Sequence, residues 1–379
     1  MHVINFGDEF GPEKIIEVHN QAVGLNAVLV LDNLSRGPGK GGIRMTPTVD
    51  VREVFRLART MTWKTALADL PFGGAKSGIQ ADPKKISLQQ KKELVQAFAR
   101  ALKSVCPKEY IAAPDVNTAE QEMKWFAEAN GDWNAATGKP ANMCMKVGGK
   151  KKCGIPHEFG STGFGVAHAT AVAVQHLKIG MKDATVAIEG FGNVGTFAFK
   201  HLQEMGAKIV AVSDSKGCLY NPDGLDYDSV FDVKQKTGSV INYQQGQVLP
   251  NKSIFELDVD VLIPGALPDV INKDNVDKVK AKILSEAANI PTTPEMELIL
   301  HNRDVLVVPD FVANAGGVIS SYAEYMGKSP KEMFKLVENK IKKNTKAVLE
   351  RAKKENILPR DAALKIAQER VLKAMKKKK

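Results

Sequence analysis

Residues 185–195 read Thr185-Val-Ala-Ile-Glu-Gly-Phe-Gly-Asn-Val-Gly195, and this stretch decides the fold. Its first residues are apolar or β-branched, as in a buried strand, and a helical pattern follows from Thr196 to Met205. Between them, Gly190, Gly192 and Gly195 form the spacing G-x-G-x-x-G. That spacing, after a strand and before a helix, favours a turn that binds the pyrophosphate of a dinucleotide. The free N–H groups and positive dipole end of the helix would face the phosphates.

The segments beyond this turn alternate between strand and helix patterns, which predicts a parallel α/β sheet. Further strands are expected over residues 208–213, 259–264, 282–285 and 305–308. Two helices are expected after the sheet is complete, from about Lys331 and from about Pro359.

Asp214 ends the strand after the glycine turn, close to where an acid that binds the adenosine ribose of NAD is expected. The structural alternative is a turn aspartate before Gly217. Ser213 and Lys216 could instead receive the 2′-phosphate of NADP. The sequence therefore predicts a nicotinamide dinucleotide and leaves NAD or NADP open.

The half of the chain before the turn has a different pattern, with lysines in glycine-rich or helix-end settings. The stretches 35–42 and 69–78 are glycine-rich and are expected to be loops. They carry Lys40 and Lys76, and Lys64 lies near the end of a helical pattern. If these lysines converge, repulsion and partial burial would lower at least one pKa and permit acid–base chemistry near neutral pH. The regular elements expected here are a strand over 26–32, helices over 50–67 and 88–105, and a short strand over 110–113.

A chain of 379 residues is too long for one ordinary core and suits two domains. The boundary is expected within residues 138–156, which show little hydrophobic pattern. We predict a substrate-binding and catalytic domain over residues 1–155, joined by C-terminal helices at about 335–379. A Rossmann-type dinucleotide-binding domain would occupy residues 156–334. The expected class is therefore α/β with two domains and an active site in the cleft between them.

The formal net charge is +10, and much of it lies in the run 146–152 and the tail 373–379. No zinc-finger spacing, aromatic RNA-binding box or basic zipper accompanies the charge, so we interpret it as solvated surface and expect no nucleic-acid partner. No apolar run is long enough to span a bilayer, and the polar start of the chain does not resemble a signal peptide.

The four cysteines (Cys106, Cys144, Cys153 and Cys218) are too few for a disulfide framework in so long a chain. We interpret them as free structural cysteines and expect a reducing, cytoplasmic location. The alternative is a metal site formed by Cys144, Cys153 and His157, but their spacing matches no zinc pattern.

Several motifs, in order along the chain, resemble the glutamate/leucine/phenylalanine/valine dehydrogenase family. The resemblance spans roughly residues 25–325. The motifs of the first half are Lys40-Gly-Gly-Ile-Arg-Met45, Met61-Thr-Trp-Lys64, Leu70-Pro-Phe-Gly-Gly-Ala-Lys76 and Ala112-Ala-Pro-Asp-Val-Asn-Thr118. Those of the second half are the glycine turn, Glu286-Ala-Ala-Asn-Ile-Pro-Thr-Thr-Pro294 and Pro309-Asp-Phe-Val-Ala-Asn-Ala-Gly-Gly-Val-Ile-Ser-Ser321.

The resemblance implies a role for each matching position. Lys76 would polarise the keto group and activate water, Asp115 would carry the proton to and from the substrate nitrogen, and Lys64 would hold the α-carboxylate. Asn289 and Asn314 would contact the nicotinamide side of the cofactor, and Thr162 its carboxamide. The other implied cofactor contacts are Gly190, Gly192, Asn193, Val194, Gly195 and Asp214.

Two positions indicate the substrate class. In the glutamate enzymes of this family, a lysine and a serine hold the side-chain carboxylate, and here Lys40 and Ser321 occupy those positions. A buried cation without an anionic partner is costly, so Lys40 would fit an apolar leucine pocket poorly. Gly41, Ala113 and Val318 would line the same pocket. The resemblance thus implies reversible oxidative deamination of glutamate to 2-oxoglutarate and ammonia, by a homo-oligomer, with a hexamer favoured.

Two alternatives stay open at this point. A branched-chain amino-acid dehydrogenase is suggested by the overall length, which is closer to that of the leucine and valine members. It is also suggested by Glu158, which stands where the glutamate enzymes have an arginine. A catalytically silent dinucleotide-binding subunit is the alternative from another class, and the intact set of Lys64, Lys76 and Asp115 argues against it.

Overall fold

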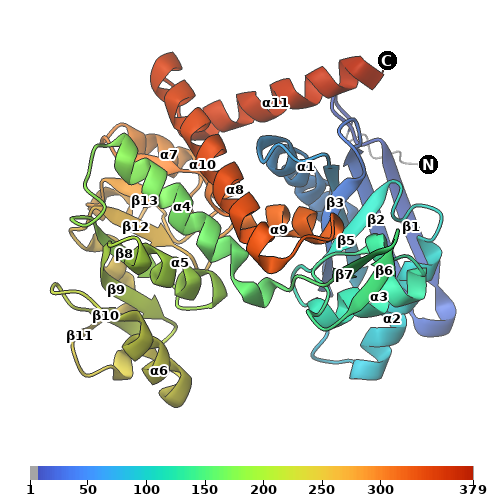
Figure 1. Cartoon of the computed structure of the whole chain (residues 1–379), viewed down its shortest axis with the longest axis horizontal. Coiled ribbons are helices and arrows are strands. Elements are labelled where there is room, and N and C mark those ends of the chain that lie inside the picture. Colours follow the sequence, from blue (N-terminus) through green and yellow to red (C-terminus); the bar gives the residue numbers. More distant parts are fainter. Residues whose placement is uncertain (1–6, 379) are drawn as a thin grey trace. The chain divides into compact units, whose positions relative to one another are not determined.

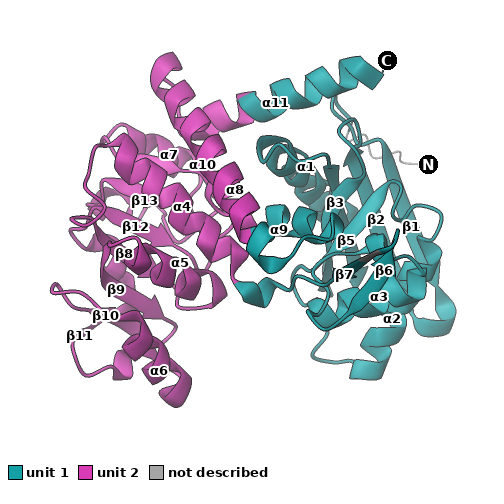
Figure 2. Cartoon of the chain, in the orientation of Figure 1, with its two compact units in different colours: residues 1–159, 318–333, 366–379 teal, residues 160–317, 334–365 magenta. Residues whose placement is uncertain are grey.

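The structure is a computed structural model that describes residues 7–378. The first six residues of the polar start and the last lysine of the basic tail lie outside the described residues. Figure 1 shows the order of the elements along the chain. The chain divides into two compact units, coloured separately in Figure 2. Unit 1 comprises residues 1–159, 318–333 and 366–379, and unit 2 comprises residues 160–317 and 334–365.

Unit 1 is built on a mixed five-stranded sheet with the strand order β1-β2-β4-β3-β5. The central strand β4 runs parallel to β3 and antiparallel to β2, and β5 lies parallel to β3 at the edge. The strands are β1 (Lys14–Asn20), β2 (Leu25–Asn33), β3 (Gly39–Thr46), β4 (Gly73–Gln80) and β5 (Tyr110–Ala113). The helices of this part are α1 (Val51–Leu67), α2 (Leu88–Ala101) and α3 (Glu120–Asn130).

The helices of unit 1 begin where their capping residues allow. The Asp50 side chain accepts a hydrogen bond from the Glu53 N–H at the start of α1. Ser87 and Gln90 form a reciprocal capping box at the start of α2, which satisfies two N–H groups that lack helical partners. The predicted helix over 88–105 is therefore present, but it ends earlier, at Ala101. Apolar faces of α2 and α3 pack with β2, β3 and β4 in one hydrophobic core that includes Leu29, Phe98 and Phe126.

The expectation that residues 35–42 and 69–78 are loops was wrong for the parts that carry the lysines, because these parts are the strands β3 and β4. The glycines are explained by close packing rather than by turns. A Cβ at Gly41 would lie 1.7 Å from the Ala75 carbonyl oxygen, and one at Gly74 would lie 2.3 Å from the Thr62 nitrogen on α1. Neighbouring backbones approach so closely here that any side chain at these positions would overlap them.

Unit 2 contains a seven-stranded sheet with the order β11-β10-β9-β8-β12-β13-β14. The strands β9, β8, β12, β13 and β14 are parallel to one another, which confirms the predicted parallel α/β sheet. The strands β10 and β11 add an antiparallel edge that the sequence pattern did not reveal. The strands are β8 (Thr185–Glu189), β9 (Lys208–Asp214), β10 (Gly217–Tyr220), β11 (Gln247–Leu249), β12 (Val261–Pro264), β13 (Ile283–Ser285) and β14 (Leu306–Val308). The helices are α4 (Ser161–His176), α5 (Asn193–Glu204), α6 (Tyr227–Thr237), α7 (Pro294–His301) and α8 (Asp310–Ala313).

The three C-terminal helices are α9 (Gly316–Tyr325), α10 (Pro330–Glu355) and α11 (Pro359–Lys378). Helix α11 contributes to both units, because residues 359–365 belong to unit 2 and the rest to unit 1. In its unit 1 part, Arg370 donates hydrogen bonds to the carbonyls of Ala66 and Leu67 at the end of α1. No helix within residues 7–378 is both long and apolar enough to cross a membrane.

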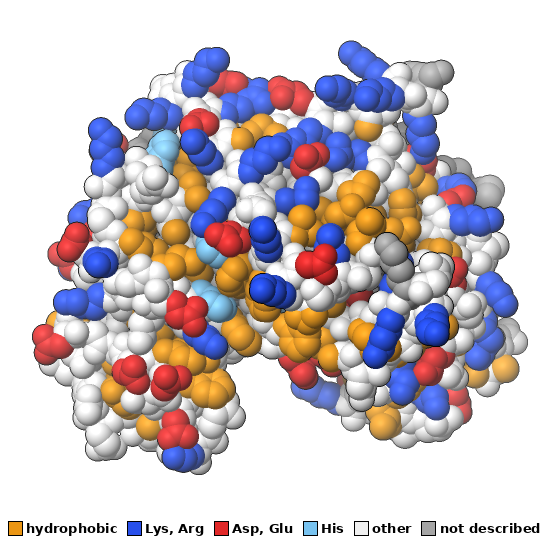
Figure 3. Space-filling model, in the orientation of Figure 1, with side chains coloured by type: hydrophobic (Ala, Val, Ile, Leu, Met, Phe, Trp, Pro, Cys, Tyr) orange, Lys and Arg blue, Asp and Glu red, His pale blue; other side chains and the backbone are white. Residues whose placement is uncertain are grey.

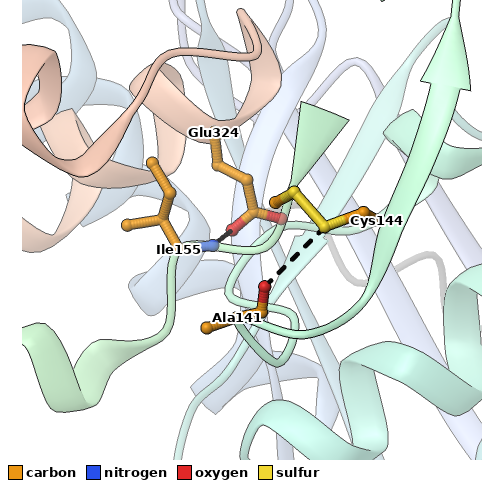
Figure 4. The surroundings of a disulfide bond; sticks show 5 residues. Ala141, Cys144, Ile155 and Glu324 are labelled. Atoms are coloured by element: carbon orange, nitrogen blue, oxygen red, sulfur yellow. Dashed lines mark hydrogen bonds between the residues drawn. A yellow bond between two sulfur atoms is a disulfide. The ribbon is translucent and has the colours of Figure 1, made fainter. Parts of the chain in front are cut away.

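The expectation that the four cysteines are free was wrong for two of them, because Cys144 and Cys153 form a disulfide. They lie opposite each other in a short antiparallel hairpin, β6 (Cys144–Val147) and β7 (Lys150–Cys153), whose pairing places their side chains side by side (Figure 4). Because this segment lacks a hydrophobic pattern, its hairpin could not be recognised from the sequence. Cys106 and Cys218 are free and buried.

Candidate active site

Lys76, which is buried, and Asp115, which is partly buried, form an ion pair in unit 1. Lys76 lies on the central strand β4, and Asp115 follows the edge strand β5. The Lys76 Nζ lies 3.0 Å from Asp115 Oδ1. The other carboxylate oxygen, Oδ2, accepts a hydrogen bond from Arg44 Nε at 2.9 Å, and the Arg44 Nη1 pairs with Glu53 at 2.6 Å. Two cations thus share one carboxylate in a site with little exposure.

The protonation of this pair is set by burial and by charge. Burial lowers the pKa of Lys76, the Asp115 carboxylate opposes that effect, and the net pKa lies below the ordinary lysine value of 10.5. Burial raises the pKa of Asp115, but Lys76 and Arg44 outweigh it, so the pKa of Asp115 is lowered. The site therefore holds an ionised carboxylate beside an amine that loses its proton more readily than an exposed lysine does.

Arg44 is a residue that the sequence reasoning missed. It stands inside the motif Lys40–Met45, but no role was assigned to it. The register of β3 against β4 pairs Arg44 with Gly78, and its guanidinium reaches both Asp115 and Glu53. No periodicity signals this contact, because Asp115 lies 71 residues further along the chain.

Lys40 is buried, with 1% of its surface exposed, on β3. Its Nζ donates to the carbonyl oxygens of Ala112 at 2.7 Å and Ile111 at 3.3 Å, both on β5. Within residues 7–378 no carboxylate forms an ion pair with it. Burial lowers its pKa well below 10.5, and the charges of Lys139 and Lys76 act in the same direction. An ammonium has three N–H donors, so one remains for a further acceptor.

A second ion pair, Lys139–Glu324, is buried in unit 1 and was also missed. The Lys139 Nζ lies 2.6 Å from Glu324 Oε1, and its ammonium stands 4.1 Å from the centre of the Trp133 ring. Glu324 Oε2 accepts backbone hydrogen bonds from Gly138 at 2.7 Å and Ile155 at 2.9 Å, the latter drawn in Figure 4. Glu324 therefore ties helix α9 to the two ends of the segment that carries the disulfide hairpin. Its negative charge also raises the pKa of Lys40.

The other expected substrate residues are placed as follows. Lys64 lies in the last turn of α1, and Ala113 ends β5 opposite Gly42. Gly41 lies between β4 and β5, and its lack of a side chain is already required by strand packing. Val318 is buried and Ser321 is partly buried on α9, three residues before Glu324. Glu158 is exposed in a short 3-10 turn, His157–Phe159.

The glycine turn of unit 2 lies between β8 and α5, where the strand order changes direction from β9 on one side to β12 on the other. Gly190 has a φ of +94°, and a Cβ there would lie 2.8 Å from the Ala266 Cβ after β12. A Cβ at Gly195 would lie 1.8 Å from the Gly190 carbonyl oxygen. Packing thus requires these two glycines, as the motif predicts.

Gly192 differs, because a Cβ there would meet no protein atom within 4 Å. Packing does not explain this glycine, whereas the approach of a pyrophosphate to the backbone does. Helix α5 begins at Asn193, earlier than the predicted Thr196, so Asn193 and Val194 contribute N–H groups to its first turn. These observations fit a dinucleotide at the switch point of the sheet.

Of the four remaining cofactor positions, Asn289, Asn314 and Thr162 lie around the carboxyl ends of β13 and β14, and Asp214 lies at the end of β9. Asn314 Nδ2 donates to Asn289 Oδ1 at 3.1 Å, which brings the two predicted nicotinamide residues together. Thr162 lies in the first turn of α4, and a Cβ at Gly317 would be 3.0 Å from its hydroxyl. Asp214 ends β9 and is held by four donors from the protein itself.

A partly buried arginine and three buried carboxylates form a clamp that supports the Asn289 loop from within unit 2. Arg360, in the first turn of α11, contacts Glu286 at 2.9 Å, Glu297 at 2.5 Å and Asp310 at 3.1 Å. Asp310 in turn accepts a hydrogen bond from the Ile290 N–H at 3.0 Å. The sequence reasoning did not identify this clamp, because its four members are separated along the chain and Glu297 and Arg360 lie outside the quoted motifs.

Figure 3 shows how charged side chains are distributed on one face of the molecule. Lysine and arginine side chains are spread over this face, and acidic side chains lie among them.

Comparison with known proteins matches both parts of the chain to one family. Residues 12–131 match "Glu/Leu/Phe/Val dehydrogenase, dimerisation domain", and residues 153–379 match "Glutamate/Leucine/Phenylalanine/Valine dehydrogenase". The glutamate dehydrogenase of Aeropyrum pernix is 42% identical over 362 residues, which cover 91% of this chain and 84% of that protein. The NADP-specific glutamate dehydrogenase of Saccharolobus shibatae is 38% identical over 387 residues, covering 96% and 89%. A crystal structure of the hetero-hexameric glutamate dehydrogenase of Thermus thermophilus, in a leucine-bound form, aligns with a TM-score of 0.83 and 29% identity, covering 97% and 90%.

Proposed function

Because the chain belongs to the glutamate/leucine/phenylalanine/valine dehydrogenase family, we propose that it catalyses the reversible oxidative deamination of L-glutamate to 2-oxoglutarate and ammonia with NAD or NADP. The family assignment confirms the resemblance inferred from the motifs and makes the chain an NAD(P)-dependent amino-acid dehydrogenase. The choice of glutamate over other amino acids is supported chiefly by one observation, the environment of Lys40.

Lys40 is a buried amine with one unused N–H donor and no carboxylate contact among the described residues. Such a group is costly in an apolar pocket, but it suits a ligand that brings a carboxylate. A side-chain carboxylate next to Lys40 would favour its charged form and offset the burial that lowers its pKa. Ser321 would add a hydroxyl donor to the same carboxylate. Leucine, valine and phenylalanine lack this group.

The chemistry is assigned to Lys76, Asp115 and Lys64. The nicotinamide ring, when bound, would accept a hydride from the α-carbon and leave an imine on the substrate. Lys76 in its neutral form takes a proton from the water that attacks this imine, and in its charged form it polarises the oxygen of the keto acid. Asp115, ionised and 3.0 Å away, carries the proton to and from the substrate nitrogen. Lys64 holds the α-carboxylate.

We assign unit 1 to substrate binding and unit 2 to the dinucleotide, so that residues 318–333, which carry Val318 and Ser321, belong to the substrate part rather than to the dinucleotide part expected over 156–334. We also propose a homo-hexamer in the cytoplasm. Because Cys144 and Cys153 form a disulfide, the cysteines no longer support a reducing location. The proposed cytoplasmic location therefore depends on the supply of nicotinamide dinucleotides inside the cell.

The test is steady-state turnover of glutamate, leucine, valine and phenylalanine by the wild type and two variants. We expect Lys40→Leu to lower kcat/KM for glutamate at least about 30-fold, equivalent to about 2 kcal/mol for the loss of a buried charged contact, with little loss for leucine. Lys103→Leu, which removes an exposed lysine of the same unit, should change neither. Faster turnover of leucine than of glutamate by the wild type would contradict the substrate assignment.

A further variant separates an enzyme from a silent subunit. Lys76→Ala should lower kcat by about 10²–10⁴-fold, as expected for the loss of an acid–base group, while dinucleotide binding measured by NADPH fluorescence is retained. A wild type that binds NADPH but turns over none of the four amino acids would favour the silent subunit.

A further inference from the structure

The disulfide Cys144–Cys153 closes a hairpin that is weak by itself. The hairpin consists of four residue pairs, and no residue of β6 is buried. Lys146 stands directly opposite Lys151, and like charges at opposite positions destabilise a pair of strands. An isolated two-stranded hairpin is marginally stable at best in water. The pairing of β6 with β7 is therefore expected to depend on the covalent bond.

The two bonded cysteines are the ones that a reductant can reach. Both are partly exposed, whereas Cys106 and Cys218 are buried. Burial raises the pKa of each buried thiol to about 12, which keeps it protonated and inert. The hairpin places lysines beside both bonded cysteines, with Lys146 two residues after the first and Lys152 directly before the second. Nearby positive charge favours the thiolate that thiol–disulfide exchange requires, so exchange is directed to this pair.

Hydrogen bonds connect the hairpin and its two ends to helix α9. The N–H groups of Gly138 and Ile155, which lie on either side of the hairpin in the sequence, both donate to Glu324 Oε2, at 2.7 and 2.9 Å. Figure 4 shows the Ile155 contact in the surroundings of the disulfide. Within the hairpin, Lys152 Nζ donates to the Tyr325 carbonyl oxygen at 2.9 Å. Opening of the hairpin would therefore act on two adjacent residues at the end of α9.

Glu324 is linked to both groups that are proposed to bind the substrate side-chain carboxylate. Burial lowers the pKa of Lys40, and among the nearby charges Glu324 opposes that effect whereas Lys139 adds to it. Glu324 also pairs with Lys139, at 2.6 Å, and so offsets a charge that repels Lys40. Ser321 lies three residues before Glu324 on the same helix. The position of Glu324 therefore affects both the charge of Lys40 and the placement of Ser321.

The catalytic pair is anchored elsewhere in unit 1. Lys76 lies on β4 and Asp115 follows β5, and Arg44 on β3 donates to the same carboxylate. All three strands belong to the five-stranded sheet, whose order does not include β6 or β7. A change in the hairpin is therefore expected to alter substrate affinity more than the chemical step.

We propose that Cys144 and Cys153 form a thiol–disulfide switch that controls the affinity of the chain for its dicarboxylate substrate. The inference rests on the proposed function, which places the substrate side-chain carboxylate at Lys40 and Ser321. The oxidised, closed hairpin holds Glu324 in place, and the chain binds glutamate tightly. After reduction the hairpin opens, Glu324 loses its fixed position, and KM for glutamate rises. Disulfides of cytoplasmic proteins are usually transient and either catalytic or redox-sensing, which agrees with the proposed location.

The exchange is balanced with a dithiol as the reductant. A thiolate of the dithiol attacks one cysteine sulfur, the S–S bond breaks, and the other cysteine leaves as a thiolate. The second thiolate of the dithiol then attacks the mixed disulfide and releases the first cysteine. Two electrons and two protons pass from the dithiol to the chain, which gains two thiols while the dithiol becomes a disulfide.

The first experiment measures KM and kcat for glutamate in the oxidised chain and after reduction with dithiothreitol. Iodoacetamide labelling and mass spectrometry establish which cysteines are free in each sample. We expect reduction to raise KM at least about fivefold with little change in kcat, and oxidation with diamide to restore the low KM. An unchanged KM in a sample with Cys144 and Cys153 reduced would overturn the inference, even if the reduced chain unfolds at a lower urea concentration.

The double variant Cys144→Ser/Cys153→Ser is the control for effects of the reductant elsewhere, because it keeps Cys106 and Cys218. It should show the high KM both with and without dithiothreitol. A low KM in this variant, or a KM that still changes with dithiothreitol, contradicts the switch.

Two neighbouring lysines test the connection to α9 in the oxidised chain. Lys152→Met removes the contact with Tyr325 and should raise KM for glutamate about twofold or more, as expected for the loss of one hydrogen bond. Lys151→Met removes the same charge at the next, exposed position and should leave KM unchanged. Equal KM values for the two variants would overturn the proposed connection.

The last experiment needs no turnover. Glutarate, a dicarboxylate without a reacting group, is titrated into the NADPH complex by calorimetry, and hydrogen exchange is followed in residues 138–155 and 318–325. Reduction should weaken glutarate binding about fivefold and speed exchange in both segments, and unchanged exchange overturns the switch. If glutarate affinity follows the redox state but glutamate is not turned over, the proposed reaction fails and the switch stands. Glutamate turnover with a KM that ignores the redox state leaves the enzyme assignment intact and overturns the switch.

Discussion

At the scale of single residues, the Asp115 carboxylate is shared by two cations. Lys76 lies 3.0 Å from one oxygen, and Arg44 donates to the other at 2.9 Å. Because Arg44 is a positive charge close to Lys76, it lowers the pKa of Lys76, and it also helps to keep the pKa of Asp115 low. Arg44 is therefore expected to act through the pair rather than on the substrate.

This gives a prediction on pH dependence. In Arg44→Gln, the pKa of Lys76 should rise, because a like charge is lost and Asp115 is left to Lys76 alone. Activity that needs neutral Lys76 beside ionised Asp115 should then begin at higher pH, so the ascending limb of kcat/KM moves toward higher pH. Since the two groups titrate together, the limb reports the pair and not either residue. Arg52→Gln, which removes an exposed arginine of α1, should leave the profile unchanged, and an unmoved limb in Arg44→Gln would refute the role.

At the scale of elements, the glycines in the turn between β8 and α5 are needed for different reasons. Gly195 is required by the backbone, because a Cβ would lie 1.8 Å from the Gly190 oxygen, whereas Gly192 has open space in front of it. We expect Gly195→Ala to lower the free energy of unfolding by about 1–3 kcal/mol or more through overpacking. Gly192→Ala should cost under about 1 kcal/mol, as a poorer helix cap, but should raise the Kd for NADPH about tenfold or more.

Urea unfolding and NADPH titration of the two variants separate these duties. If Gly192→Ala bound NADPH as the wild type does, the open side of the turn would not be the dinucleotide site.

The Arg360 clamp joins the start of α11 to β13, α7 and α8. Burial and mutual repulsion raise the pKa values of Glu286 and Glu297, and Arg360 opposes that rise. Arg360→Met leaves carboxyl groups without their cation, so we expect a loss of about 3–5 kcal/mol in the free energy of unfolding.

The loss should also depend on pH. Without Arg360 the carboxyl pKa values rise further, so the folded state binds more protons than the unfolded state and loses stability as pH rises through those values. Urea unfolding should therefore show a larger deficit at pH 8 than at pH 6. Lys353→Met, at an exposed position of α10, is the control, and an equal deficit at both pH values would count against the clamp as a proton-binding cluster.

Strong periodicity made most elements predictable. The α1 pattern and the alternation after Thr185 gave helices and parallel strands that the structure contains. Local pattern failed where a long-range contact sets the conformation. Glycines at 41 and 74 looked like turns but lie in paired strands, and the Cys144–Cys153 hairpin has no apolar alternation. The same limit hid Arg44 and Arg360, whose partners lie far away along the chain.

At the scale of the whole molecule, the proposed homo-hexamer predicts the mass of the assembly. The strand β1 lies at the edge of the unit 1 sheet and is mostly exposed, and residues 12–131 match a dimerisation domain. A closed, symmetric hexamer of identical 41.2-kDa chains would have a mass of about 247 kDa. This mass is expected when the chain is expressed alone. Light scattering after size-exclusion chromatography measures this mass directly. A species near 41 kDa at micromolar concentration would contradict the proposed assembly.

Helix α11 belongs to both units, with Arg360 bound in unit 2 and Arg370 bound to the end of α1 in unit 1. Both anchors are translated after more than 350 residues of the chain they stabilise. Although domains generally fold as they leave the ribosome, neither unit here can complete its contacts until α11 has emerged. Nascent chains are thus expected to stay incompletely packed until late in synthesis, and to depend on chaperones for that interval. The protein would then be most prone to misfolding during its synthesis and not in its mature, folded state.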